Sequence, residues 1–171
     1  MSLPIIAEIG WNHMGDMNLA RKMIQEAADN GASIAKFQTW KVSRLKPGEW
    51  DLDGRREIYN KAELSEENHK FLISSCKQCQ IEFMSSAFSI PDAQLLLDLE
   101  CQSIKIPSFE VANVELLEFC KSNFSRIYVS TGTATSLEIV NLAKIFEGYD
   151  GNLTVMHCVS AYPCDASIIN L

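Results

Sequence analysis

The sequence Ile104-Lys105-Ile106-Pro107-Ser108-Phe109-Glu110 guides the interpretation of the rest of the chain. It reads as a short buried strand that carries a lysine and is followed directly by a serine and a glutamate. A lysine within an apolar strand costs several kcal/mol unless an anion meets its ammonium group. We therefore expect this stretch to form one wall of an active site that handles an anion.

Apolar stretches that predict strands alternate along the chain with segments of helical periodicity. The predicted strands cover residues 4–9, 34–39, 81–86, 104–110, 126–131 and 153–158. Helix starts are marked by capping residues or by proline, namely Asp16 or Asn18, Ser65, Pro91, Asn113 and Thr135. The last of these helices is predicted to face the core with Ile139, Val140, Ala143 and Phe146. Residues 40–64 lack periodicity and are predicted to form a long loop, either functional or disordered.

Six alternations of strand and helix predict an α/β fold with a parallel sheet, either doubly wound or a barrel. The turn after the first strand, residues 10–15, lacks the middle glycine of a dinucleotide-binding loop. Polar residues follow nearly every strand, which favours a TIM (β/α)₈ barrel, because such barrels assemble their active site from many strand ends. These residues are Glu8, Lys36 and Gln38, Ser85 and Ser86, Lys105 to Glu110, Ser130 and Thr131, and His157 to Tyr162.

Six units are fewer than the eight of a complete barrel. A barrel without two strands leaves two open edges and an uncovered core. We therefore expect residues 1–171 to form one incomplete TIM-barrel domain of about six β/α units. The missing units would belong to a longer protein or come from a partner chain.

Composition narrows the class of protein. The chain is 47% hydrophobic and 22% charged, which is typical of a globular domain. A net charge of −7 argues against nucleic acid or an anionic membrane as a partner. Six cysteines lie in or beside apolar segments and no signal peptide is recognisable, so we expect free thiols in the cytoplasm. Cys76 and Cys79 form a CxxC pair in mid-helix, where a zinc or redox role is not expected.

The charged residues at the strand ends have two readings. Lys36 and Lys105, with nearby hydroxyl groups, make a plausible cradle for a phosphate and a carboxylate. Glu8 and Glu110 would then position the lysines or move protons. In the alternative reading, each lysine is merely paired with a glutamate for structural reasons. Two such lysines at strand ends favour the functional reading.

Six motifs occur in a fixed order: IAEIGWNHMGD at 6–16, AKFQT at 35–39, FMSSAF at 83–88, IKIPSFE at 104–110, STGTAT at 130–135 and HCVSAYP at 157–163. In this order the chain resembles the N-acetylneuraminate (sialic acid) synthase family, along essentially its whole length. That family includes legionaminic and pseudaminic acid synthases and spore coat polysaccharide proteins. The resemblance implies a metal-dependent condensation of phosphoenolpyruvate with an open-chain N-acetylated hexose such as N-acetylmannosamine. The products would be a nonulosonic acid and phosphate.

The resemblance also implies roles for residues at the matching positions. Lys36 and Lys105 would bind the anionic groups of phosphoenolpyruvate, and Glu110 would lie at the reacting centre. Glu8 would set the charge around the lysines. Hydrogen bonds would come from Ser86, Ser108, Ser130 and Ser160, and sugar contacts from Gln38 and Tyr162. His13 belongs to the first motif, where ordering of the loop is at least as plausible as catalysis.

Some positions depart from the family pattern. Ala87 stands where the family has proline, and Pro107 and Phe109 stand where it has small residues. The resemblance implies Mn²⁺ or Mg²⁺ in the full-length protein, held by histidines of the last two strands, so no metal ligand is expected in this chain. Those strands and a C-terminal antifreeze-like domain would be absent, and the family forms homodimers. His157 is expected to be a core histidine, and His69 to face solvent.

Three functions remain open from the sequence. The first is a sialic-acid-type synthase, of which this chain alone is expected to be inactive. The second is a Schiff-base aldolase that uses Lys36 or Lys105 as its nucleophile. The third is a non-catalytic remnant of the barrel. Residues 40–64 are expected to cover the sugar, with candidate contacts at Trp50, Arg55, Arg56 and Tyr59.

Overall fold

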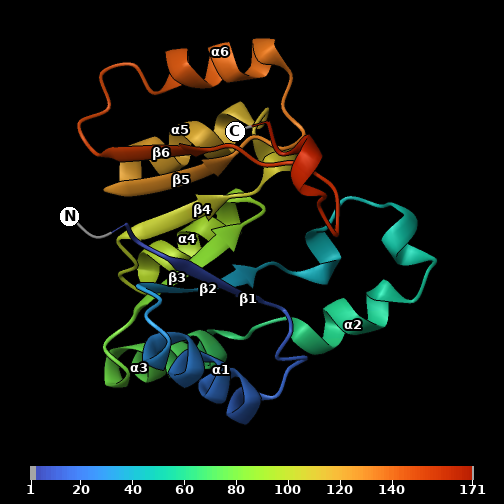
Figure 1. Cartoon of the computed structure of the whole chain (residues 1–171), viewed down its shortest axis with the longest axis vertical. Coiled ribbons are helices and arrows are strands. Elements are labelled where there is room, and N and C mark those ends of the chain that lie inside the picture. Colours follow the sequence, from blue (N-terminus) through green and yellow to red (C-terminus); the bar gives the residue numbers. More distant parts are fainter. Residues whose placement is uncertain (1–2, 171) are drawn as a thin grey trace. The chain divides into compact units, whose positions relative to one another are not determined.

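A computed structural model describes residues 3–170 of the chain, and Figure 1 shows their strands and helices. The chain divides into two compact units, of which the first ends at Cys101 and the second begins at Gln102. The first unit contains strands β1 (Ile6–Gly10), β2 (Ile34–Thr39) and β3 (Glu82–Ala87). The second contains β4 (Ser103–Ile106), β5 (Arg126–Ser130) and β6 (Asn152–Met156). The predicted alternation of strands and helices is confirmed.

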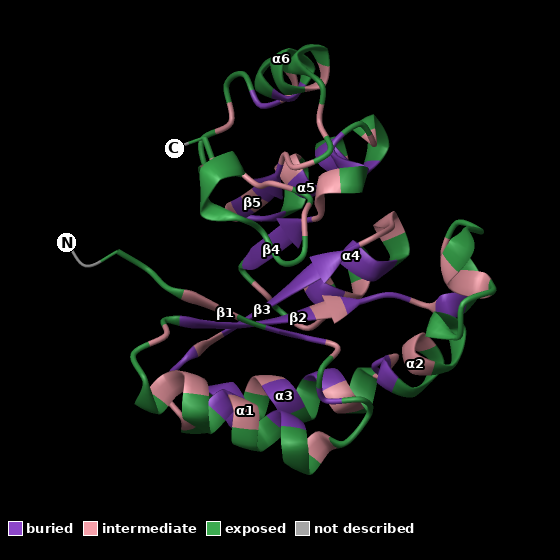
Figure 2. Ribbon diagram, turned by 45° about the vertical axis from the view of Figure 1, so that its right-hand side comes forward, coloured by how far each residue is buried: buried purple, intermediate pink, exposed green. Residues whose placement is uncertain are grey.

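The first unit is a parallel sheet covered by helices. β1 pairs with β2, with a register shift between Glu8 and Gly10, and β2 pairs with β3 from Ile34 opposite Glu82 to Thr39 opposite Ala87. Its helices are α1 (Met17–Asp29), α2 (Arg55–Ala62), α3 (Glu66–Gln78) and α4 (Ile90–Asp98). α1 and α3 lie side by side under the sheet, and their buried stripes appear purple in Figure 2. Stacked rings of Phe37 and Phe83, 5.6 Å apart, lie within this core.

The helices begin where capping chemistry predicts. The Asp16 carboxylate accepts hydrogen bonds from the backbone N–H groups of Asn18 and Leu19, at 2.8 and 3.1 Å. Ser65 forms a reciprocal capping box at the start of α3. In α4 the capping residue is Ser89, and Pro91 lies in the first turn, where its missing N–H costs nothing.

The segment between β2 and α3 is not a plain loop, so the prediction for residues 40–64 was wrong in this respect. It contains α2 and two 3₁₀ turns, Val42–Arg44 and Glu49–Asp51. Only Ala62 of α2 is buried. A helix with a single buried residue leaves no apolar stripe in the sequence, which explains why periodicity did not reveal it.

The second unit pairs β4 with β5 and β5 with β6, again in parallel. Its helices are α5 (Val114–Asn123) and α6 (Ser136–Ile145), with a 3₁₀ turn at Ala166–Ile168. β4 ends at Ile106, four residues before the predicted end, because Pro107 cannot donate to a strand ladder and a 3₁₀ turn, Ser108–Glu110, follows.

The predicted buried face of α6 was largely wrong. Leu142 and Phe146 are buried, whereas Ile139 and Val140 are 40% and 50% exposed and Ala143 is also exposed. Apolar residues occur almost all round this helix. Its periodicity therefore does not specify which side meets the sheet.

Within residues 3–170, no helix has both the length and the apolar character needed to cross a lipid bilayer.

Candidate active site

Lys36 is a buried charged residue of the first unit with two polar partners. It lies on β2 and is only 5% exposed. Its Nζ atom lies 2.5 Å from Oε2 of Glu8 on β1 and donates a hydrogen bond to Oγ of Ser86 on β3, at 3.1 Å. Burial lowers the pKa of Lys36, and the Glu8 carboxylate opposes that shift. Three of the predicted residues are thus brought together around one ammonium group.

Lys105 has a corresponding environment in the second unit. It lies on β4, is 8% exposed, and its ammonium group donates a hydrogen bond to Oγ of buried Ser130 on β5. The same hydroxyl receives a contact from the thiol of Cys158 at 3.3 Å. Two further predicted residues therefore lie in direct contact.

The two lysine–serine pairs have the same strand geometry. Lys36 is opposite Met84 in the register of β2 and β3, and it bonds to Ser86, two residues further along β3. Lys105 is opposite Tyr128, and it bonds to Ser130, two residues further along β5. Residues two apart lie on one face of a strand, so each lysine side chain leans along its sheet toward the carboxyl end of the next strand. A buried ammonium group beside a hydroxyl donor is well suited to bind an anion.

Ser108 and Ser160 each lie beside Gly132 in the second unit. The backbone N–H of Gly132 donates to Oγ of Ser108 at 3.1 Å. A Cβ atom added at Gly132 would lie 2.8 Å from Oγ of Ser160, closer than real Cβ atoms approach. Glycine is therefore required for the close approach of Ser160 to this backbone position.

The other predicted residues differ in their surroundings. Glu110 is buried, and its Oε2 accepts a hydrogen bond from Nδ2 of Asn113 at 2.7 Å. Gln38 is half-buried beside Gly10, where an added Cβ would lie 3.7 Å from Nε2 of Gln38 and 3.1 Å from Oε1 of Glu8. Tyr162 is 96% exposed, so its ring does not line a buried part of its unit.

The expectation for His69 was wrong. His69 is fully buried on α3 rather than solvent-facing. Its Nδ1 lies 2.8 Å from the carbonyl oxygen of Ser65, which can only accept, so Nδ1 carries the proton. Nε2 then accepts from the Thr39 hydroxyl at 2.8 Å, and burial lowers the pKa of His69. The Ser85 hydroxyl lies 2.7 Å from Oγ1 of Thr39 and completes this buried chain.

The chain has two other histidines, His157 and His13. His157 is exposed rather than in a core, and its Nε2 lies 2.7 Å from the carbonyl oxygen of Ile169. The expectation of a core histidine was wrong because β6 is largely exposed. His13 is buried, its Nδ1 accepts from the N–H of Gly15 at 3.0 Å, and burial lowers its pKa. This is the geometry of a loop-ordering residue.

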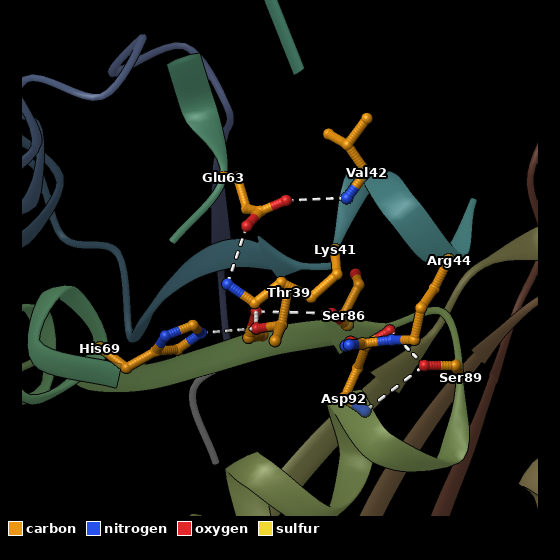
Figure 3. A network of polar contacts seen from close by, with 10 residues as sticks. Thr39, Lys41, Val42, Arg44, Glu63, His69, Ser86, Ser89 and Asp92 are labelled. Atoms are coloured by element: carbon orange, nitrogen blue, oxygen red, sulfur yellow. Dashed lines mark hydrogen bonds and ion pairs between the residues drawn. The ribbon is translucent and has the colours of Figure 1, made fainter. Parts of the chain in front are cut away.

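Figure 3 shows a polar network at the base of the segment between β2 and α3 that sequence reasoning missed. Glu63 accepts from Nζ of Lys41 at 2.8 Å and from the N–H of Val42 at 2.7 Å, which joins the two ends of the segment. Arg44 pairs with buried Asp92, whose Oδ2 accepts from the Ser89 hydroxyl at 2.6 Å. The sequence did contain a pointer to this network. Lys41 and Glu63 are opposite charges at the two ends of a stretch without periodicity.

Within the described residues, no three or more His, Cys, Asp or Glu side chains gather as metal ligands would. The six thiols are free, and burial raises the pKa of Cys76 to about 12.

The parallel strands with alternating helices, and the buried lysines at their ends, define an α/β protein built of barrel-type β/α units. Comparison with known families matches residues 23–171 to the NeuB family. The chain belongs to the NeuB family, and the resemblance seen in its motifs is confirmed.

Similar proteins support this assignment. N,N'-diacetyllegionaminic acid synthase of Campylobacter jejuni is 35% identical over 98% of this chain and 54% of its own length. Pseudaminic acid synthase of Helicobacter pylori is 31% identical over 98% of this chain and 53% of its own length. The crystal structure of N-acetylneuraminic acid (sialic acid) synthetase from Leptospira borgpetersenii, in complex with citrate, aligns with a TM-score of 0.85 and 32% identity. That alignment covers 98% of this chain and 59% of the synthetase chain, and it confirms the predicted truncated-barrel α/β class.

The chain spans about half the length of the curated relatives it matches.

Proposed function

We propose that this chain carries the phosphoenolpyruvate-binding part of a nonulosonic acid synthase. The methylene carbon of phosphoenolpyruvate would attack the aldehyde carbon of an open-chain N-acetylated hexose and form the new C–C bond. The aldehyde oxygen would take up a proton, water would add to the resulting oxocarbenium carbon, and phosphate would leave by C–O cleavage. The names of the relatives support a sugar acid as product, and the repeated lysine–serine geometry supports an anionic substrate.

The proposed roles follow the chemistry of each group. Lys36 with Ser86, and Lys105 with Ser130, bind anionic groups of phosphoenolpyruvate as charged hydrogen-bond donors. Ser108 and Ser160 add hydroxyl donors, and Glu110 orients the sugar or the attacking water. Gln38 and Tyr162 contact the sugar, and Glu8 balances the charge of Lys36.

A divalent cation, Mn²⁺ or Mg²⁺, is proposed only for the full-length protein, where it would polarise the aldehyde. The described residues do not gather three or more His, Cys, Asp or Glu side chains that could hold it, so we assign it no ligand in this chain. We likewise propose a cytoplasmic enzyme that forms a homodimer when complete, and we expect no phosphate release by this chain alone.

Titration of the purified chain with phosphoenolpyruvate in a calorimeter tests the proposal. Lys36→Met and Lys105→Met should each weaken binding by at least about tenfold, because each removes one charged donor. Lys22→Met, on the exposed side of α1, is the matched control and should bind as the wild type does. Absence of binding, or equal binding by all four proteins, would exclude this assignment.

A Schiff-base aldolase is the second candidate, favoured by one observation. Burial lowers the pKa of Lys36, and a nucleophilic amine must be uncharged. The ion pair with Glu8 at 2.5 Å works against it, because the carboxylate holds the proton on the amine. Borohydride reduction in the presence of pyruvate separates the two functions. A lysine adduct found by peptide mass spectrometry would establish the aldolase, whereas the synthase predicts none.

A further inference from the structure

Three aromatic residues occupy equivalent positions in the first unit. Trp11 is the first residue after β1, Trp40 the first after β2, and Phe88 the first after β3. The carboxyl ends of parallel strands meet at one edge of a sheet, so these rings lie at the edge toward which Lys36 leans. These three residues were not among the candidate sugar contacts predicted from the sequence.

Trp50 and Tyr59 join these three rings and form an aromatic cluster of Trp11, Trp40, Trp50, Tyr59 and Phe88. The ring centroid of Tyr59 lies 6.1 Å from Trp11, 5.7 Å from Trp40 and 5.5 Å from Trp50. Phe88 packs edge-on against Trp40 at 5.7 Å. Trp40 is buried, and the other four rings are partly exposed. Partly exposed rings around a buried one are common in walls that bind organic ligands.

The indole N–H of Trp40 has an unusual environment. Nε1 is buried and has no hydrogen-bond acceptor among the described residues. Buried tryptophan N–H groups usually find a partner, because an unmet donor is costly. Trp50 shows the ordinary case, since its Nε1 donates to the carbonyl oxygen of Lys46 at 2.9 Å. The unmet donor of Trp40 therefore points to an acceptor that arrives with a ligand.

We propose that the aromatic cluster recognises an acetamido group of the acceptor sugar. The acetamido carbonyl oxygen accepts the hydrogen bond from Nε1 of Trp40, and its methyl group packs against the surrounding rings. The acetamido group is uncharged, with one carbonyl acceptor and one apolar methyl end. The aromatic cluster offers a matching surface, because it has one unmet donor, Nε1 of Trp40, among aromatic rings. This inference rests on the proposed function, which supplies the sugar. Because Nε1 is buried, neighbouring side chains must shift when the sugar binds.

Trp40→Phe tests the proposal, because it keeps a ring and removes the N–H group. The probes are N-acetylmannosamine and mannose, titrated into the full chain and followed by ligand-observed NMR. The variant should bind N-acetylmannosamine at least about tenfold more weakly than the wild type and mannose equally well. Its Tm should fall only through the loss of buried volume, because no hydrogen bond of the unliganded protein is lost.

Tyr149→Phe is the matched control. It removes an O–H group that is already bonded to the carbonyl oxygen of Phe124, outside the aromatic cluster, so Tm should fall while the preference for N-acetylmannosamine over mannose persists. Two outcomes would overturn the proposal: a wild type without that preference, or a Trp40→Phe variant that retains it. Phosphoenolpyruvate titration of the same variant separates this failure from failure of the proposed function, because Trp40 has no part in binding that anion.

Discussion

Lys36 and Glu8 form an ion pair whose two members differ sharply in exposure. The Lys36 side chain is 6% exposed, whereas that of Glu8, 2.5 Å away, is 52% exposed. The lysine therefore bears most of the desolvation cost, and the glutamate keeps much of its hydration. Such an ion pair contributes little to folding stability. It does keep a buried ammonium group available to bind an anionic ligand.

Lys36→Met should separate stability from binding. Methionine fills similar volume without a charge to desolvate, and Glu8 remains hydrated, so the free energy of unfolding should stay the same or rise by about 1 kcal/mol. Phosphoenolpyruvate binding should weaken by at least about tenfold. Urea unfolding and calorimetric titration measure the two quantities.

Glu8→Gln is the complementary variant. It leaves the buried ammonium group with its serine partner but without its counter-charge, so unfolding should become easier by about 1–3 kcal/mol. A Lys36→Met variant that is strongly destabilised would instead assign this lysine a structural role.

The buried His69 predicts a pH dependence of stability. Its pKa in the folded chain is lowered from 6.5, so below pH 6.5 the unfolded chain takes up a proton that the folded chain does not. The free energy of unfolding should therefore fall as the pH drops from 7 to 5, with a slope of at most about 1.4 kcal/mol per pH unit for this histidine. Urea unfolding at several pH values measures that slope.

His69→Gln should reduce the slope, and the same substitution at exposed His157 is the control. His13, also buried with a lowered pKa, contributes in the same direction and should account for part of the slope that remains. An unchanged slope in His69→Gln would show that His69 is not the titrating group.

The sequence predicted the strands, and the lysines and serines at their ends, for a simple physical reason. Continuous apolar runs such as residues 34–39 are long enough to indicate buried strands, and a lysine within one is conspicuous. Ser86 and Ser130 were identified because they end such runs. Their bonds to Lys36 and Lys105 depend only on register between neighbouring strands, which parallel pairing fixes.

The burial of His69 could not be predicted from the sequence in the same way. Its burial depends on Thr39 and Ser85, which lie on two separate strands and turn their hydroxyl groups toward α3. From the sequence, a histidine four residues after a helix cap looks like any exposed helical residue. The aromatic cluster was missed for a related reason, since Trp11, Trp40 and Phe88 are far apart in sequence and share only their position after a strand.

Glu63 should control the order of the segment between β2 and α3. Glu63→Ala removes two hydrogen bonds that join the ends of this segment, so trypsin should cleave faster at Arg55 and Arg56. Limited proteolysis with mass spectrometry measures the rate. Glu66→Ala, which removes only an exposed ion pair with Lys70, should leave that rate unchanged. Equal rates in the two variants would mean that contacts other than those of Glu63 hold the segment.

Gly132→Ala tests whether the close packing of Ser160 against Gly132 matters for binding. The added Cβ would lie 2.8 Å from Oγ of Ser160 and 3.1 Å from Cβ of Cys158, so the side chain of Ser160 must move. Overpacking of this kind typically costs about 1–3 kcal/mol. The substitution should also move the Ser160 hydroxyl from its position beside Gly132, whose N–H group donates to Oγ of Ser108.

We expect Gly132→Ala to weaken phosphoenolpyruvate binding by about tenfold, because one hydroxyl donor is displaced while Lys105 and Ser130 are untouched. Thr133→Ala, at the exposed neighbouring position, should change neither binding nor stability appreciably. If Gly132→Ala lowered Tm without weakening the binding of phosphoenolpyruvate, Ser160 would have to be removed from the proposed ligands. The glycine would then serve only the packing of the loop that follows β5.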